Sequence, residues 1–219
     1  MKNFNYYTPT EIVFGNDSES KIGYLVRRYE GTKVLIHYGG KSAERSGLLN
    51  DICRQLDAEG ILYVKLGGVV PNPRLSKVYE GIELCRKEGV NHILAIGGGS
   101  VIDSAKAIAY GLAYDGDVWD LFDGKAEAKA CYPIGVVLTI PAAGSEMSNG
   151  CVITNEVGSR KRAYNNDLAR PKFAIMNPER TFSLSTYQTA CGIVDIMMHT
   201  MERYFSQEDD MILTDELAE

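Results

Sequence analysis

Short apolar runs alternate with longer amphipathic runs along residues 33–141, and this alternation constrains the fold more than any other feature of the sequence. The apolar runs have the length of buried strands, whereas the amphipathic runs have helical spacing and end at glycines. Strands that alternate with helices form βαβ units, so we expect an α/β fold with a parallel sheet covered on both faces. The expected strands are 33–40, 61–69, 92–100 and 132–141, and the expected helices are 42–60, 74–89 and 101–116.

The pattern changes in the last third of the sequence. Residues 151–164 contain two extended runs around a turn, which predicts an antiparallel hairpin, and 172–178 predicts one more strand. From about Ser185 the spacing becomes helical and stays so, with Thr214 as the expected cap of a last helix. We therefore expect two parts, an α/β domain over residues 1–182 and the start of a helical domain over residues 183–219.

Composition excludes several classes of function. The formal net charge of −6 argues against a nucleic-acid or an anionic membrane surface as partner. No run is apolar and long enough to span a bilayer, and no secretory signal is visible. The five cysteines lack CxxC spacing, which favours reduced thiols and a cytoplasmic location.

The first candidate site is the segment IGGGS at residues 96–100, which joins an expected strand to an expected helix. Glycines allow close approach to a phosphate, and the helix that follows presents free N–H groups and a positive dipole end. Ser100 would cap the helix or donate to a phosphate, and Asp103 lies where a capping box has its acidic residue. An ordinary strand-to-helix turn explains the same residues, because neither the GxGxxG nor the P-loop pattern is present.

A second glycine turn follows the strand expected at 33–40, at Gly39 and Gly40. In a dinucleotide fold this position often faces the adenine ribose. Lys41 and Ser42 stand where an acidic residue would bind a 2′-hydroxyl, which favours a 2′-phosphate and therefore NADP. The alternative is a solvated turn in which Ser42 caps the next helix.

The third candidate site is Asp195 and His199, four residues apart in the segment GIVDIMMHTMERYF. On a helix these side chains share one face, which suits two ligands of one metal ion. A carboxylate buried among apolar residues is costly, and a cation would relieve that cost. The alternative is an ordinary Asp–His hydrogen bond, or an Asp195 at the solvent edge of the helix. Glu202 would then support the metal site from outside or form a salt bridge. By donor type the pair suits iron, zinc, nickel or cobalt.

Five segments, taken in order, resemble the iron-containing (group III) alcohol dehydrogenases, and in particular their NAD(P)H-dependent butanol dehydrogenase branch. The resemblance covers nearly the whole chain. The segments are GGVVPNPR (67–74), AIGGGSVIDSAKAIA (95–109), LTIPAAGSEMSNGCVITN (138–155), NPERTFSLS (177–185) and GIVDIMMHTMERYF (192–205).

The resemblance implies a Rossmann-like dinucleotide-binding domain followed by an all-helical metal-binding domain, the architecture that dehydroquinate synthases share. The active site would lie between the two domains. Position by position, the resemblance implies that a cofactor contacts Gly39, Gly40, Ser42, Asn72, Gly97, Gly98, Gly99, Ser100, Asp103, Thr139, Ser145 and Lys161.

The same resemblance implies that Asp195 and His199 are the first two of four metal ligands. In the family, two histidines from later helices complete the set, but this sequence has no histidine after His199. The chain thus resembles the N-terminal portion of a longer protein, and we expect little or no activity from these 219 residues alone.

The implied function is a metal-dependent NAD(P)(H) alcohol dehydrogenase or aldehyde reductase for small primary alcohols and aldehydes of the butanol type. Fe²⁺ is implied by resemblance, Zn²⁺ is an alternative, and a homodimer is plausible for the family. Two other functions stay open: a glycerol dehydrogenase or dehydroquinate synthase relative, and a nucleotide-binding fragment without catalysis. The segment PAAGSEM and the PNP turn favour the alcohol dehydrogenase.

Overall fold

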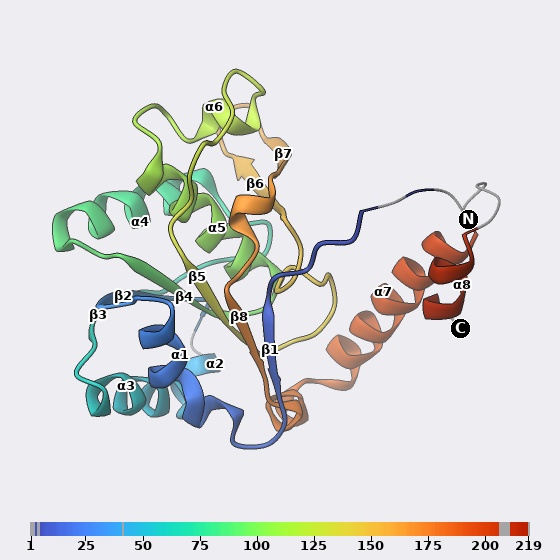
Figure 1. The fold of residues 1–219 in the computed structure, drawn as a ribbon, viewed down its shortest axis with the longest axis horizontal. Coiled ribbons are helices and arrows are strands. Elements are labelled where there is room, and N and C mark those ends of the chain that lie inside the picture. The colour runs from blue at the N-terminus through green and yellow to red at the C-terminus, as the bar shows by residue number, and fades with distance from the viewer. Residues whose placement is uncertain (1–2, 4, 41, 206–210, 219) are drawn as a thin grey trace.

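The computed structural model describes residues 3, 5–40, 42–205 and 211–218 of the 219-residue chain (Figure 1). Its centre is a six-stranded sheet in the order β1-β8-β5-β4-β2-β3, and every neighbouring pair is parallel. This confirms the α/β prediction. The strands are β1 (Glu11–Phe14), β2 (Lys33–Tyr38), β3 (Leu62–Leu66), β4 (His92–Gly97), β5 (Ile134–Leu138) and β8 (Phe173–Met176).

Helices cover both faces of the sheet, and each face has its own apolar core (Figure 1). Consecutive strand residues point to opposite faces, so in β2 Val34 and Ile36 enter one core while Leu35 enters the other. One face carries α1 (Ile22–Arg28), α2 (Ser42–Arg45) and α3 (Leu48–Ala58), and the other carries α4 (Leu75–Glu88), α5 (Gly99–Ala113) and α6 (Trp119–Phe122).

A separate antiparallel hairpin confirms the expectation for residues 151–164. It consists of β6 (Gly150–Asn155) and β7 (Arg160–Asn165), and it lies beside α5 and α6 at one end of the molecule (Figure 1). Its inner residues, Cys151 and Ile153, are buried in the same core as α5. Short 3₁₀ helices also occur between these elements, at Ser18–Lys21, Asp167–Ala169 and Pro178–Ser183.

Two helices follow, α7 (Thr186–Tyr204) and α8 (Ile212–Ala218), and Figure 1 shows them projecting away from the sheet. The Ser185 hydroxyl caps α7 by accepting from the Gln188 N–H at 3.2 Å. None of the described residues of these two helices is buried. Within the described part of the chain, no helix has the length and apolar character needed to cross a membrane.

Two local predictions were wrong, and one strand was missed. The helix expected over 42–60 is interrupted at Gly47, whose φ of +78° is left-handed, so Ser42 begins the short α2 rather than capping one long helix. Thr214 lies inside α8 rather than at its start. Strand β1 was not expected at all, because four residues carry little periodicity and their partner β8 lies about 160 residues away.

Candidate functional site

The strand order changes direction between β2 and β4, because β3 is added on one side of β2 while β4, β5 and β8 follow on the other. In open parallel sheets, ligands bind at such a switch point, outside the carboxyl ends of the strands. Tyr38 at the end of β2 is in register with Ile96 near the end of β4. The two glycine turns identified in the sequence therefore emerge side by side at this edge.

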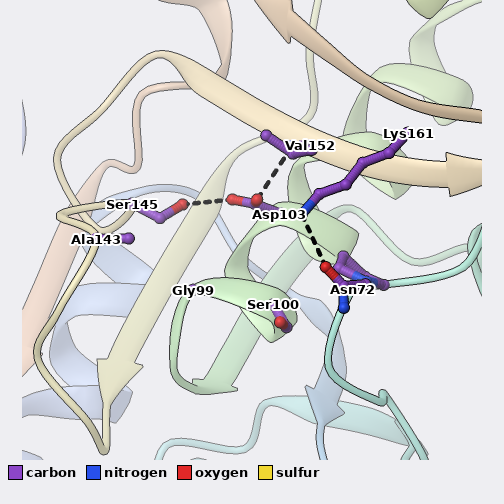
Figure 2. Close-up of a pocket in the computed structure, with 9 residues that line it drawn as sticks. Asn72, Gly99, Ser100, Asp103, Ala143, Ser145, Val152 and Lys161 are labelled. Atoms are coloured by element: carbon purple, nitrogen blue, oxygen red, sulfur yellow. Dashed lines mark hydrogen bonds between the residues drawn. The ribbon is translucent and has the colours of Figure 1, made fainter. Parts of the chain in front are cut away.

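A cavity of about 330 Å³ opens at this edge, beside the glycine turn after β4 (Figure 2). Its walls come from four segments: the turn before α4, the first turns of α5, the β5–β6 loop (residues 139–149) and the hairpin. The lining residues are Asn72, Pro73, Gly99, Ser100, Asp103, Ala143, Ser145, Val152 and Lys161.

The three glycines at the end of β4 serve two different needs. A Cβ on Gly97 would lie 2.6 Å from the Val101 side chain, and a Cβ on Gly98 would lie 2.4 Å from that of Ile140. Tight packing therefore requires glycine at both positions. A Cβ on Gly99 would meet only Ala143, at an ordinary 3.7 Å, yet Gly99 faces the cavity. The missing side chain at Gly99 thus leaves space for a ligand rather than for the protein.

Helix α5 starts at Gly99, and Gly99 and Ser100 of its first turn line the cavity. The N–H groups of Val101 and Ile102 instead donate to the Gly98 carbonyl. The capping predictions for Ser100 and Asp103 were wrong: the N-cap is Gly98, and no side chain among the described residues caps this helix. Ser100 instead lies inside the first turn and lines the cavity. The first N–H groups of a helix lack partners within it, so they and the helix dipole favour an anion here.

Asp103 braces the cavity wall (Figure 2). Its Oδ1 accepts a 2.7 Å hydrogen bond from the Ser145 hydroxyl, and its Oδ2 accepts a 3.0 Å bond from the Val152 N–H. The pKa of Asp103 is raised overall, because its burial outweighs the hydrogen bonds from Ser145 and Val152 and the charge of Lys106, which lower it. Because both oxygens are engaged, Asp103 holds the loop and hairpin in place.

Lys161 and Asn72 point toward each other at the edge of the cavity (Figure 2). The Lys161 Nζ donates a 2.8 Å hydrogen bond to Asn72 Oδ1, and both side chains are exposed. Asn72 has a left-handed φ of 56°, and next to it the Pro73 carbonyl accepts from the Thr154 N–H at 2.8 Å. The hairpin and the turn before α4 are thus joined at two points, with an ammonium group at the cavity edge.

The structure brings half of the sequence-predicted cofactor residues into this cavity. Asn72, Gly99, Ser100, Asp103, Ser145 and Lys161 line it. The other six lie behind or beside the cavity. The Gly97 carbonyl accepts from the Thr139 N–H at 3.1 Å, Gly98 packs on Ile140, and Gly39 lies near Val101. Gly40 and Ser42 are exposed. Lys41 lies outside the described residues.

Sequence reasoning missed the remaining lining residues, Pro73, Ala143 and Val152. They contribute backbone and small apolar surfaces, which carry no motif of their own. Pro73 is adjacent to the predicted Asn72, and Ala143 stands two residues before the predicted Ser145, so proximity in sequence was the available signal.

The Asp195–His199 pair has the predicted helical geometry but not the predicted burial. His199 Nε2 lies 3.7 Å from Asp195 Oδ1, and its Nδ1 lies 3.9 Å from Glu202 Oε2. The side chains of Asp195 and His199 are 47% and 45% exposed, so the expected cost of a buried carboxylate is absent here. Among the described residues, no group of three metal-ligating side chains forms, and this pair alone does not complete a metal site.

Helix α7 nevertheless touches the cavity loop just before this pair. A Cβ on Gly192 would lie 3.1 Å from the Pro141 carbonyl oxygen, so glycine permits close approach at this point. Gly192 stands one turn before Asp195. The candidate metal pair is thereby connected to the loop that supplies Ala143 and Ser145 to the cavity.

A family model described as iron-containing alcohol dehydrogenase matches residues 9–178. A probable NADH-dependent butanol dehydrogenase of Bacillus subtilis is 44% identical over 218 residues, and an NADPH-dependent aldehyde reductase of Escherichia coli is 37% identical over 223 residues. Both alignments cover all of this chain and 56% of the relative, so the chain spans about half the length of these curated relatives.

Solved structures agree with this result. The crystal structure of an NADH-dependent butanol dehydrogenase from Thermotoga maritima superimposes with a TM-score of 0.96 at 43% identity. The superposition covers 100% of this chain and 55% of that one. A structure described as 1,3-propanediol oxidoreductase superimposes with a TM-score of 0.90 at 26% identity, over a similar share.

Proposed function

Because this chain belongs to the iron-containing alcohol dehydrogenase family, we propose that its cavity binds the pyrophosphate of NAD(P)(H). The observation that carries the proposal is the geometry of Gly99. It lies at the switch point of the sheet, starts helix α5, and leaves open space that the protein's own packing does not need. A phosphate is the ligand that such a strand–glycine–helix junction favours.

Three groups of this chain would hold the pyrophosphate. The N–H groups of Gly99 and Ser100 would donate toward the anion, and the Ser100 hydroxyl would add a donor from the same turn. The ammonium of Lys161 contributes positive charge from the hairpin side. Asp103 would support the wall rather than bind the ligand, because both of its oxygens accept hydrogen bonds from the loop and the hairpin.

We further propose that the whole protein reduces small aldehydes, or oxidises small primary alcohols, of the butanol type. When bound, the nicotinamide supplies or accepts the hydride. The chain's own residues fix the position of the cofactor and keep the β5–β6 loop against it. Relatives named butanol dehydrogenase and aldehyde reductase support this substrate class.

Asp195 and His199 are proposed ligands of a divalent cation, Fe²⁺ by family resemblance or Zn²⁺. The described residues give two ligands and not a complete site, so we expect little turnover of butanal by these 219 residues. The same observation favours a second candidate function, a nucleotide-binding module without catalysis. Metal-dependent turnover of butanal by the purified 219-residue chain would exclude that second function.

The coenzyme preference is also a proposal. Ser42 is exposed at the start of α2, after the glycine turn of β2, where it would accommodate a 2′-phosphate. A relative named NADH-dependent is 44% identical to this chain and one named NADPH-dependent is 37% identical, so the relatives support NAD(P) in general. Fluorescence titration with both coenzymes measures the preference, and equal affinities would remove the NADP assignment.

Three broader assignments are proposed with the function. We propose a domain boundary near residue 183, because the described helices after it lie away from the sheet (Figure 1). We propose a cytoplasmic location, because the five cysteines, all within the described part of the chain, are free. A homodimer is proposed from family resemblance.

The decisive experiment is an NADH fluorescence titration of the 219-residue chain and two variants. Gly99→Val places an isopropyl group in the cavity where the pyrophosphate would lie and should abolish saturable binding. The double variant Asp195→Ala/His199→Ala should bind as tightly as wild type, because neither residue lines the cavity. Absence of saturable binding to wild type, or equal binding by Gly99→Val, would refute the proposed site.

A further inference from the structure

Lys106, in the middle of α5, is fully buried yet carries an ammonium group. Five oxygen atoms surround its Nζ. The carbonyl oxygens of Ser145, Ser148 and Gly150 each lie at 2.8 Å, and the hydroxyl oxygens of Ser145 and Ser148 each lie at 3.2 Å. The three carbonyl oxygens equal the three N–H donors of an ammonium in number, and the two hydroxyl oxygens lie just beyond them. Together the five oxygens form a shell around one positive charge.

This shell has the character of a site for a dehydrated monovalent cation. Rings of backbone carbonyls replace the hydration shell of K⁺ in selective channels, and the same type of ligand surrounds Lys106 Nζ here. A lysine ammonium is a compact point charge on a flexible stem, so it can occupy the centre of such a shell.

The carbonyl oxygens that converge on Lys106 Nζ need a positive charge between them. Residues 139–149 of the β5–β6 loop, all described, form neither helix nor strand, so their carbonyls lack regular backbone partners. Leaving buried carbonyls unpaired, with their negative ends facing one another, costs free energy. The same loop supplies Ala143 and Ser145 to the cavity wall, and Gly150 begins the hairpin that carries Val152.

We propose that the Lys106 ammonium acts as a tethered monovalent cation that shapes the β5–β6 loop into the wall of the nucleotide cavity. K⁺ or NH₄⁺ should take its place when the ammonium is removed. The effect on nucleotide binding rests on the proposed function above, whereas the effect on the loop does not.

Helix α5 also binds this loop through a second residue, Asp103. Asp103, one turn before Lys106, accepts from the Ser145 hydroxyl and the Val152 N–H. Thus the two residues hold the loop and the start of the hairpin through groups of opposite charge, one binding carbonyls and the other binding donors. Lys106 does not line the cavity, so it is a positioning residue that acts through the loop.

Charge balance around Lys106 agrees with an ammonium ion at neutral pH. Burial lowers the pKa of Lys106 to about 8, while the charges of Asp103 and Glu146 raise it and that of Arg170 lowers it. The amine therefore stays largely protonated near pH 7 despite its burial.

The test uses Lys106→Met in the 219-residue chain. Methionine keeps the apolar stem but ends one atom short of Nζ, so the centre of the oxygen shell becomes free. We expect NADH affinity to fall by about tenfold or more in sodium-free, lithium-containing buffer. K⁺ or NH₄⁺ at the same ionic strength should restore most of it, because Li⁺ is too small for oxygens near 2.8 Å.

Two variants serve as controls. Lys125→Met removes an exposed ammonium and should change neither affinity nor salt response. Lys106→Arg keeps the charge, but its planar fork cannot sit at the centre of the shell, so it should bind weakly and show no K⁺ rescue. Unchanged affinity in Lys106→Met, or equal rescue by Li⁺ and K⁺, would overturn the proposal.

A nucleotide-free measurement on wild type separates this proposal from the proposed function and does not depend on a variant folding. In ¹H–¹⁵N spectra that select lysine ammonium groups, Lys106 should give a slowly exchanging NH₃⁺ signal at pH 7. Finding this signal without NADH binding would leave the cation shell supported and the proposed function refuted. A neutral or rapidly exchanging Lys106 amine would overturn the cation shell itself.

Discussion

The Lys161 ammonium and the Asn72 amide oxygen lie 2.8 Å apart although 89 residues separate them in the sequence. Lys161 comes from the hairpin, and Asn72 comes from the turn before α4. Their hydrogen bond joins two separate elements across one wall of the cavity (Figure 2). The bond also holds a positive charge at the point where the proposed pyrophosphate would enter.

Replacing Lys161 with Gln should weaken NADH binding by about three- to tenfold, because it removes one charge-assisted contact to phosphate. Stability should hardly change, since both side chains of the Lys161–Asn72 pair are exposed. Arg162→Gln is the matched control: it removes the neighbouring charge of β7, which faces Asp123 instead. Equal losses of affinity in the two variants, measured by fluorescence titration, would show that only overall charge matters.

The glycine turn predicts opposite outcomes for two adjacent substitutions. Gly98→Ala places a Cβ 2.4 Å from the Ile140 side chain and should reduce the free energy of unfolding by about 1–3 kcal/mol. Gly99→Ala meets only Ala143 at 3.7 Å, so its stability should stay within about 0.5 kcal/mol of wild type. Because its methyl group enters the cavity, Gly99→Ala should still lose nucleotide affinity. Urea unfolding and NADH titration measure the two effects, and a stable, tightly binding Gly99→Ala would contradict the account.

The fold was largely predictable from sequence because its βαβ alternation is a local pattern. The buried runs of β4 and β5, the stop at Gly89 and the hairpin all follow from neighbouring residues. The side-chain partners were not predictable in this way. Asp103 looked like a helix cap, but its partners Ser145 and Val152 lie 42 and 49 residues away.

Lys106 is the most informative omission. A lysine inside the apolar run VIDSAKAIA was a visible signal, because α5 is buried on nearly all sides and a charge there needs a partner. The partners, however, are backbone carbonyls of a loop, and backbone atoms have no signature in the sequence. The metal pair shows the reverse case: helical spacing correctly predicted the proximity of Asp195 and His199, while their apolar neighbours wrongly suggested burial.

The buried side chains of His37 and His92 should make the free energy of unfolding depend on pH. Burial lowers the pKa of both His37 and His92 to about 4, from an unfolded value of 6.5. The unfolded chain therefore binds more protons than the folded chain between these values, so stability should fall as the pH drops from 6.5 toward 4. Each histidine contributes up to about 3 kcal/mol to this loss.

His92→Phe isolates one half of that effect. His92 stacks on Phe173 with ring centroids 5.9 Å apart, and neither of its ring nitrogens has a hydrogen-bond partner among the described residues. Phenylalanine should preserve the stacking without titrating. Urea unfolding at pH 7 and pH 4.5 should thus show a smaller acid loss than in wild type; an identical loss would mean that His92 does not stay neutral in the fold.

Helix α7 should be much less protected than α5. None of the residues of α7, all of which the structure describes, is buried, whereas α5 is buried along most of its length. Local opening is easiest where few apolar contacts are lost, so amides of α7 should exchange at least about 100-fold faster than those of α5. Hydrogen exchange at several protein concentrations tests this. Equal protection at the lowest concentration would mean that α7 is covered in solution.

The central claim is that NAD(P)(H) binds at the Gly99 junction, and an amide chemical-shift map during NADH titration tests it most directly. The account predicts saturable shifts that are largest at Gly98, Gly99 and Ser100, with smaller shifts at Asn72 and Ser145. Residues of α7 near His199 should shift little. Absence of saturable shifts at Gly99 and Ser100, or a map centred on another surface, would contradict it.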